Sequence, residues 1–393
     1  MTTHFRFNNG GTIIAFEDAF IRRDLFSTGG LWNWGDNNSG TLGINTSGSG
    51  TNASSPVQTI AGGTNWKQVA AAGLVAAAIK NDGTLWAWGS NNYGMLGDNT
   101  FLNKSSPIQT ISAGTNWKQV AVGNGNIAAI KTDGTLWVWG GNYYGQLGDN
   151  TGGPGIKRSS PVQTIAGGWN WKQVSCSSFH VSAIKTDGTL WMWGRNGYGA
   201  VGDNTIAVKI SPVQTSAGGT TWKQVACGTN STGAIKTDGT LWTWGRGTSG
   251  ELGNGSSSVN VSNPQQVTNG GTTWKQVACG YNYMGAIKTD GTLWTWGANN
   301  AGQLATGGIT SRNIVGQTVS AGTNWKQVYC GTSGFMGALK TNGTLWNWGS
   351  NANGELGDTT ITTRLSPVQT IAGGTNWKQA AGGQGGRAIT DIF

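Results

Sequence analysis

The chain of 393 residues is only 10% charged, contains 68 glycines and 22 tryptophans, and carries a formal net charge of +9. The tryptophans and a regular apolar alternation exclude a disordered low-complexity chain and indicate a packed β protein. No apolar run approaches the ~20 residues of a membrane-spanning helix, and Met1–Gly11 lacks the basic start and apolar core of a signal peptide. We therefore expect neither membrane insertion nor secretion.

Residues 1–24 stand outside the pattern of the rest and are predicted to form an N-terminal extension. Phe5–Phe7 and Thr12–Phe16 flank a turn-like Asn-Asn-Gly-Gly and predict a hairpin, and Glu17–Arg23 predicts a short helical turn. A free tail does not usually contain so many apolar residues. The extension therefore either packs on the ring predicted below or docks on a partner, and docking is our interpretation. The docking candidates are Phe5, Phe7, Ile13, Ile14, Phe16 and Phe20.

Residues 25–393 repeat a unit of about fifty residues that is complete at Lys131–Gly140. Asp133-Gly134 predicts a two-residue type I′ hairpin turn, and the alternation after it places Trp137 and Trp139 on one face of a strand. Apolar residues on both faces indicate a strand between two other layers. The tryptophan pair occurs seven times, as does a Trp-Lys-Gln motif that begins at Trp66, Trp117, Trp171, Trp222, Trp274, Trp325 and Trp377. Trp169 is the one tryptophan outside both motifs.

Each unit predicts four short strands, which is typical of a blade of an all-β propeller. The first unit starts with a hairpin that lacks a preceding Trp-Lys-Gln strand, and the chain ends with Trp377–Ala380, a strand that lacks its hairpin. The two ends are therefore predicted to complete one blade and close the ring. Leu25–Thr28 and Arg387–Thr390 both fit the second strand of that blade, and the sequence does not decide between them.

Thirteen of the 25 basic residues belong to the repeat: seven lysines follow the tryptophan of Trp-Lys-Gln, and six precede the hairpin turn. We expect these lysines to be spread round the ring and not gathered on one face, which argues against nucleic-acid binding. Cys176, Cys227, Cys279 and Cys330 lie five residues after the repeat tryptophan, where other units have Ala, Val or Gly. They are interpreted as small buried side chains without metal or redox chemistry.

The run Leu-Trp-x-Trp-Gly-x-Asn-x-x-Gly-x-Leu-Gly, preceded by Ala-Ile-Lys-Thr-Asp-Gly, resembles the repeat of the RCC1-like proteins. Asn142–Gly148 is a nearly complete copy, and the resemblance covers residues 25–393. It implies a seven-bladed β-propeller. The near-identity of the units is similar to bacterial and phage members. The opening Asp24–Gly35, led by a short apolar extension, resembles members from tailed phages, particularly those that infect cyanobacteria. A role in the virion, in tail fibres or in receptor recognition is what this resemblance suggests.

Enzyme chemistry finds no support in the sequence, so we expect no catalytic residues, no cofactor and no metal site. The repeated Asp82, Asp133, Asp187, Asp238 and Asp290 are interpreted as turn residues, because Asn342 replaces them in one unit. Binding candidates come instead from a variable position five residues before the hairpin lysine, predicted to lie in loops on one face of the ring. They are Phe179, His180, Tyr281, Tyr283, Met284, Phe335 and Met336.

The alternative for these candidates is that they plug the central channel or cap the inner strands; exposure is expected for Tyr281 and Tyr283. The expected function is that of a non-catalytic virion protein, located in the phage particle and in the host cytoplasm before assembly. Its expected partners are other virion proteins and a host receptor or glycan. The alternative is a soluble inhibitor or regulatory binder of a cellular protein, including an exchange-factor-like role.

Overall fold

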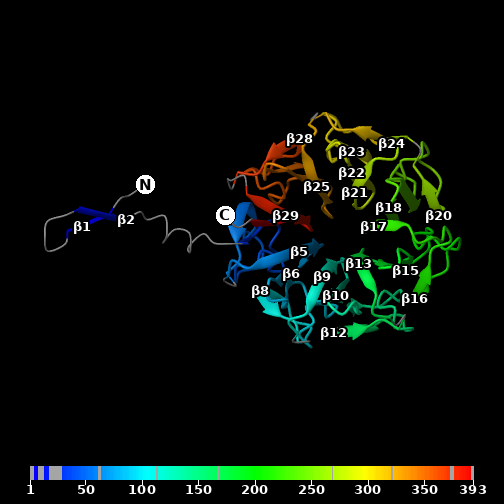
Figure 1. Ribbon diagram of the computed structural model, residues 1–393, viewed down its shortest axis with the longest axis horizontal. Helices are drawn as coiled ribbons and strands as arrows, with labels where there is room; N and C mark the ends of the chain where they lie inside the picture. Colours follow the sequence, from blue (N-terminus) through cyan, green and yellow to red (C-terminus); the bar gives the residue numbers. More distant parts are fainter. Residues whose placement is uncertain are drawn as a thin grey trace.

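The computed structural model describes residues 4–7, 13–16, 29–60, 63–111, 114–165, 168–267, 269–319, 322–371 and 376–390. Within these ranges the regular elements are strands, and seven four-stranded antiparallel sheets surround one axis (Figure 1). The predicted seven-bladed all-β propeller is confirmed. β1 (His4–Phe7) and β2 (Ile13–Phe16) form a separate two-stranded sheet, which confirms the hairpin predicted in the extension.

Each blade orders its strands from the centre of the ring outward. Blades 1 to 3 consist of β5 (Trp66–Ala72), β6 (Val75–Lys80), β7 (Leu85–Gly89) and β8 (Lys104–Gln109); β9 (Trp117–Val122), β10 (Asn126–Lys131), β11 (Leu136–Gly141) and β12 (Lys157–Gln163); and β13 (Trp171–Cys176), β14 (His180–Lys185), β15 (Leu190–Gly194) and β16 (Lys209–Gln214). Blades 4 to 6 consist of β17 (Trp222–Cys227), β18 (Ser231–Lys236), β19 (Leu241–Gly245) and β20 (Val261–Gln266); β21 (Trp274–Cys279), β22 (Tyr283–Lys288), β23 (Leu293–Gly297) and β24 (Arg312–Gln317); and β25 (Trp325–Cys330), β26 (Phe335–Lys340), β27 (Leu345–Gly349) and β28 (Arg364–Gln369).

The closing blade joins the two ends of the chain. Its strand order is β29 (Trp377–Gly382), β30 (Gly386–Thr390), β3 (Leu31–Gly35) and β4 (Ala53–Gln58). The predicted closure is therefore confirmed, and the C-terminal segment supplies the second strand. Leu25–Thr28, the competing segment, lies outside the described residues, as does Glu17–Arg23.

The hairpin turns differ from the predicted type I′. In blade 1, the Gly83 amide donates to the Lys80 carbonyl at 3.0 Å, and only Gly83 has positive φ, at 80°, whereas Asp82 does not. The turn is thus a three-residue loop with glycine in the left-handed position. Asp82 accepts hydrogen bonds from the amide and hydroxyl of Thr84, at 2.9 and 2.7 Å, which lower the pKa of its carboxyl group. The acidic residue supports the turn, as predicted, but in another geometry.

The second tryptophan of every pair connects its blade to the preceding one. Trp139, for example, is fully buried, and its indole Nε1 donates to the carbonyl of Met95 in blade 1. The same bond recurs in all seven blades at 2.7 to 2.9 Å. Leu136 and Val138, on the other face of the strand, are also buried. The strand lies between two apolar layers, which confirms the prediction from its pattern.

The glutamine of Trp-Lys-Gln joins the inner strands into a closed belt. Gln68 donates through Nε2 to the carbonyl of Val120 in the next blade and accepts from the Val120 amide through Oε1. Each inner strand makes this pair of bonds, at 2.9 to 3.2 Å, and Gln379 of the closing blade bonds to Val69 of blade 1. This glutamine belt gives the motif a structural role: it links every blade to the next.

The lysine before each hairpin turn lies between two tryptophan rings. Lys80 Nζ is 5.0 Å from the ring centroid of Trp66 and 4.3 Å from that of Trp86. Blades 1 to 6 all have this lysine clamp. In the closing blade Thr390 occupies the position, opposite Trp377. Cation–π attraction therefore reinforces six blades and not the seventh.

The ring has two distinct faces. On the loop face, each first strand turns into the second and each third strand runs into the long loop before the fourth. On the turn face lie the Asp-Gly-Thr turns and the connections between blades. The lysine that follows each inner-strand tryptophan and the clamp lysines all lie at the turn-face end of their strands. The expectation that they do not gather on one face is wrong, because positions related by rotation about an axis share one height along it.

Candidate functional site

A cluster of exposed and half-buried aromatic side chains lies on the loop face, over blades 1 to 3. Tyr143 and Tyr144 have ring centroids 4.7 Å apart, and Tyr144 meets Phe179 edge-to-face at 5.6 Å. The Arg195 guanidinium carbon lies 5.3 Å from the ring centroid of Tyr144, 5.1 Å from that of Phe179 and 5.6 Å from that of Tyr198. With Tyr93, these residues form what we call the aromatic–arginine patch.

Arg195 is the central cation of the patch, and its charge is directed toward rings. Within the described ranges it forms no salt bridge to a carboxylate. Arg246 in the next blade differs, because it hydrogen-bonds to Asn282 at 2.8 Å and lies 3.9 Å from the buried carboxylate of Glu251. Burial raises the pKa of that carboxyl group. Arg195 therefore remains available to a partner, whereas Arg246 is held by the fold.

The patch surrounds a concave site. A pocket of about 500 Å³ lies between the loops of blades 1 to 3, and its walls include Tyr93, Tyr143, Tyr144, Phe179 and Lys157. It adjoins a groove of about 600 Å³ across the mouth of the central channel, and Asn124, Ser178 and Phe179 line both. The groove is also lined by Arg195, Tyr198, Arg246 and Tyr281. The loop face thus offers an aromatic pocket beside a polar groove.

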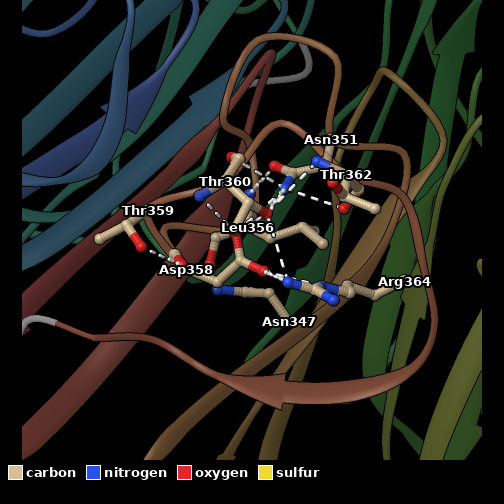
Figure 2. Close-up of polar contacts among 8 residues, drawn as sticks. All are labelled: Asn347, Asn351, Leu356, Asp358, Thr359, Thr360, Thr362 and Arg364. Carbon is tan, nitrogen blue, oxygen red and sulfur yellow. Dashed lines mark hydrogen bonds and ion pairs between the residues drawn. The ribbon is translucent and has the colours of Figure 1, made fainter.

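Side-chain hydrogen bonds hold the loops of the Asn-x-x-Gly-x-Leu-Gly motif, and blade 6 shows the arrangement. Asn351 donates through Nδ2 to Asp358 at 3.1 Å and to the carbonyl of Thr360 at 3.1 Å, and its Oδ1 accepts from the Leu356 amide at 2.9 Å (Figure 2). Asp358 pairs in turn with Arg364 at 2.8 Å. The asparagine of Asn-x-x-Gly-x-Leu-Gly therefore fastens both ends of its loop.

The same arrangement holds the two central tyrosines of the patch. In blade 2 the Asn142 side chain accepts from the Leu147 amide at 2.9 Å, and Gln146 accepts from the Tyr144 amide at 2.7 Å. The variable positions of the motif are therefore presented on a fixed frame. A surface of this kind does not have to order its loops to bind a partner, which lowers the entropic cost of association.

The comparisons with known proteins agree with this architecture. A family model described as an RCC1-like domain matches residues 25–313. The chain belongs to the RCC1-like family. It is 28% identical to the ultraviolet-B receptor UVR8 of Arabidopsis thaliana over 302 residues, which cover 75% of this chain and 67% of the receptor. It is also 28% identical to the human E3 ubiquitin-protein ligase HERC2, over 84% of this chain but only 7% of the ligase.

Solved structures show the same fold at low identity. Prp20p from Saccharomyces cerevisiae has a TM-score of 0.81 at 17% identity and covers 93% of this RCC1-like chain and 92% of its own. Human WBSCR16 has a TM-score of 0.80 at 19% identity, and the match covers 93% of this chain and 99% of WBSCR16. All four of these proteins are eukaryotic, so they add nothing to the resemblance to phage members. The virion location and the virion partners stay predictions.

Two of the predicted binding residues belong to the loop-face site. Tyr281 is 52% exposed and lines the groove, as expected, and the half-buried Phe179 is part of the aromatic–arginine patch. The binding role of both remains a prediction.

The other five predicted binding residues are buried, and the expectation that they lie in loops is wrong. His180, Tyr283 and Phe335 are the first residues of β14, β22 and β26, and Met284 and Met336 follow the last two. Tyr283 is only 2% exposed, so its predicted exposure is wrong too. Its hydroxyl donates to the carbonyl of Gly331 at 2.6 Å in the next blade. These side chains fill the space between blades and do not contact solvent.

His180 is an uncharged structural residue. Its Nδ1 lies 2.9 Å from the Ser177 hydroxyl and its Nε2 lies 3.2 Å from the Thr232 hydroxyl of the next blade. Complete burial lowers its pKa to about 3. A histidine that stays neutral near pH 7 and bridges two blades supports packing, and within the described residues no carboxylate lies beside it as an ion-pair partner.

The four cysteines line the central channel. All are free thiols, and burial raises the pKa of each, to about 12 for Cys227. Within the part of the chain that the structure describes, no three His, Cys, Asp or Glu side chains are arranged to hold a metal ion, and no helix could span a membrane. A raised thiol pKa opposes redox or nucleophilic chemistry, in agreement with a packing role.

Five of the six docking candidates of the extension lie in its hairpin: Phe5 and Phe7 in β1, and Ile13, Ile14 and Phe16 in β2. Phe20 lies outside the described residues. The docking role stays a prediction.

Most residues of the patch escaped sequence reasoning. Tyr93, Tyr143, Tyr144 and Tyr198 occupy the two variable positions of Asn-x-x-Gly in three consecutive units, where the remaining units have Asn, Ser, Thr or Ala. That clustering is visible in the sequence. Arg195, one residue before the motif asparagine of blade 3, gives no comparable signal, because its contacts with three rings depend on two blades meeting.

Proposed function

We propose that this RCC1-like chain is a non-catalytic protein-binding propeller that uses its aromatic–arginine patch to contact a partner protein. The single observation that carries the proposal is the surface group of four tyrosines and a phenylalanine around Arg195, of which Tyr93 and Tyr143 are exposed and the other three rings half-buried. Tyrosine and arginine are enriched where protein interfaces gain most of their binding energy. A patch of this composition on a rigid frame fits a regulatory or inhibitory binder.

The named relatives support this class of function without identifying the partner. Prp20p, which shares the fold, binds Gsp1p and histones, and it forms a complex with Kap60. UVR8 is a receptor and HERC2 a ubiquitin ligase, and this chain spans about two thirds of the first and a small part of the second. Propellers of this family therefore serve in proteins of different activity, and the partner follows from the surface and not from the fold.

The test places a photo-reactive phenylalanine analogue at Tyr144 and, as a control, at Ile361, which is exposed in the long loop of blade 6 outside the patch. Cross-linking in extracts of the source cells should yield a partner from the Tyr144 probe and not from the Ile361 probe. The partner would then be purified and its affinity measured. Arg195→Ala and Tyr144→Ala should each weaken binding about 30-fold, as expected for interface residues worth about 2 kcal/mol.

Arg312→Ala is the matched control, because this arginine lies at the loop-face end of β24 outside the patch. It should change the affinity less than about threefold, the usual range for a peripheral charge. Equal losses in all three variants, or unchanged affinity in Arg195→Ala and Tyr144→Ala, would contradict the proposal.

A further inference from the structure

The turn face carries a strong excess of positive charge. It holds thirteen lysines and the five turn aspartates, a formal excess of eight, whereas nine bases and seven acids on the loop-face side leave an excess of two. The net charge of the described ring is therefore concentrated on one of its two faces. This asymmetry follows from the rotational placement of the Trp-Lys-Gln and hairpin lysines.

The two sets of turn-face lysines differ in their surroundings. The clamp lysines lie over tryptophan rings, and Lys80, for instance, also lies near Asp82, whose pKa its charge helps to lower. The lysine of Trp-Lys-Gln sits where the register of each inner strand shifts, between the residues that pair with the second strand. A bulge of this kind places two residues of one strand opposite one residue of its neighbour and disrupts the ladder there.

We call this second set the bulge lysines. All seven are exposed: Lys67, Lys118, Lys172, Lys223, Lys275, Lys326 and Lys378. For the first six, the described residues provide no salt-bridge partner. They form a ring of charges on the innermost strands, around the turn-face end of the channel, at one height along the axis. A ring of like charges at one height attracts counter-ions or an anionic partner.

Exposed apolar side chains accompany these charges. Each outer strand ends at the turn face, and two residues after the end of the strand most blades carry an exposed aliphatic side chain: Ile60, Ile111, Ile165, Val319 and Ile371. Trp169, in the connection to blade 3, is 76% exposed and replaces the threonine found in most units. Its neighbour across the blade boundary is the Gly134 turn of blade 2. Lysines near the axis are thus surrounded by aliphatic and aromatic side chains further out.

We propose that the turn face docks on the surface of an anionic lipid membrane. A flat partner can meet the whole ring of bulge lysines at once, whereas a nucleic-acid duplex, which is a rod, can cross only part of it. The exposed isoleucines and Trp169 fit the apolar boundary of a bilayer, where basic residues and tryptophan occur together. The chain would bind peripherally, without inserting a strand or helix. This surface is opposite the aromatic–arginine patch, so the inference is independent of the proposed function.

The experiment is co-sedimentation of the full chain with vesicles of phosphatidylcholine alone and of phosphatidylcholine mixed with phosphatidylserine. Binding should be confined to the mixed vesicles and fall steeply with added salt. The triple variant Lys67→Gln, Lys172→Gln and Lys275→Gln should lower the partition coefficient about 100-fold, because each lysine near an anionic surface contributes roughly a factor of five. Trp169→Ala should lower it several-fold.

The control triple variant Lys104→Gln, Lys209→Gln and Arg312→Gln removes the same charge from the loop-face side and should retain binding to within about threefold. A thermal unfolding scan of each variant confirms that the propeller is folded. Equal binding to both kinds of vesicle, an equal loss in the control, or no vesicle binding would overturn the proposal. Retention of duplex DNA at a salt concentration where mixed vesicles are not bound would overturn it in favour of nucleic acid.

Discussion

Blades 1 to 6 and the closing blade have the same four-stranded sheet, but different contacts hold the second and third strands together. In blade 1 the second and third strands pair over five positions from Val75↔Gly89 to Ile79↔Leu85 and are joined by a covalent turn. In the closing blade β30 and β3 pair over three positions, from Leu31↔Ile389 to Asn33↔Arg387, and no turn joins them. The lysine clamp is missing there as well, because Thr390 takes the place of lysine.

The closing blade retains its contacts with the neighbouring blades, and these are the contacts on which closure of the ring depends. Trp34 still donates to the carbonyl of Glu355 in blade 6, at 2.8 Å, and Gln379 still completes the glutamine belt. The contacts between blades are therefore preserved, whereas those within the blade are reduced. The ring is closed mainly by its neighbours on both sides, and the seam between β30 and β3 is predicted to open first.

The largest effect is expected from removing the seam. Deletion of residues 377–393 takes away β29 and β30 and exposes the apolar faces of blade 6 and blade 1. Calorimetry should show loss of the single cooperative unfolding transition, since repeat units are stabilised by their neighbours. A circular permutant that links residue 390 to residue 29 and opens the chain between blades 4 and 5 should instead unfold cooperatively at a temperature no lower than that of the parent. If the truncated chain unfolded in the same transition as the full chain, the prediction that this seam closes the ring would be wrong.

The next effect concerns the covalent turns that the seam lacks. A methyl group at Gly83 would overlap the carbonyl oxygen of Thr115 in blade 2, and the residue has φ of 80°. Gly83→Ala should lower the free energy of unfolding by about 3 kcal/mol or more, from left-handed strain together with overpacking. Gly48→Ala is the control, since its φ of 110° is also positive but its Cβ would meet nothing within 4 Å. Similar losses in urea titrations of both variants would exclude the contact between blades as the cause.

A pH-dependent effect distinguishes blade 3 from its neighbours. Since the pKa of His180 is lowered to about 3 in the fold, the unfolded chain binds a proton below about 6.5 that the folded chain does not. The stabilisation by neutral His180 is complete above pH 6.5 and is lost as the pH falls toward 3. Between pH 7 and pH 5, the native chain should lose about 2 kcal/mol more than His180→Asn. Asparagine is chosen because blade 2 has Asn126 at this position. Parallel stability curves for the two proteins would contradict the assignment.

The smallest effect comes from exchanging the clamp. Thr390→Lys should place an ammonium group near Trp377 and Trp32 and stabilise the closing blade by about 0.5–1 kcal/mol. The reverse change in blade 3, Lys185→Thr, should destabilise by a similar amount, since Lys185 Nζ lies 4.9 and 4.7 Å from its two rings. Equilibrium unfolding of the two variants and of the double exchange checks this. A destabilised Thr390→Lys variant would show that the seam does not accommodate the lysine.

The sequence was sufficient to predict the blades because the repeat fixes them. Seven Trp-Lys-Gln motifs and seven tryptophan pairs set the number of units, and the unpaired half-units at the ends indicated closure. The prediction of a type I′ turn was wrong because Asp-Gly fits both a two-residue and a three-residue hairpin loop. The hydrogen bond from the Gly83 amide to the Lys80 carbonyl identifies the three-residue loop. Which segment fills the second strand of the closing blade was undecided, since both candidates have suitable residues and the choice depends on contacts with blade 6.

The site was harder to predict because exposure is a tertiary property. Tyr281 and Tyr283 lie two positions apart in the sequence. The Tyr281 side chain is exposed, whereas the Tyr283 hydroxyl is buried and donates to a carbonyl of the next blade. Their variability suggested a binding loop, yet a position between blades also varies, because Val75, Asn126 and His180 fill it in different ways. The aromatic–arginine patch arises where loops of three blades converge, and no single unit contains it.

The glutamine belt is the part of the joint that is the same between all blades. Each glutamine bonds only to backbone atoms of the next inner strand, at the same register in every blade, so the bond does not depend on which unit follows. One unit can be replaced by another, together with the loops it carries, without altering these bonds, provided that side chains between blades such as His180 and Thr232 remain matched. New surfaces can therefore arise by shuffling whole units within one gene, provided that the number of units remains seven.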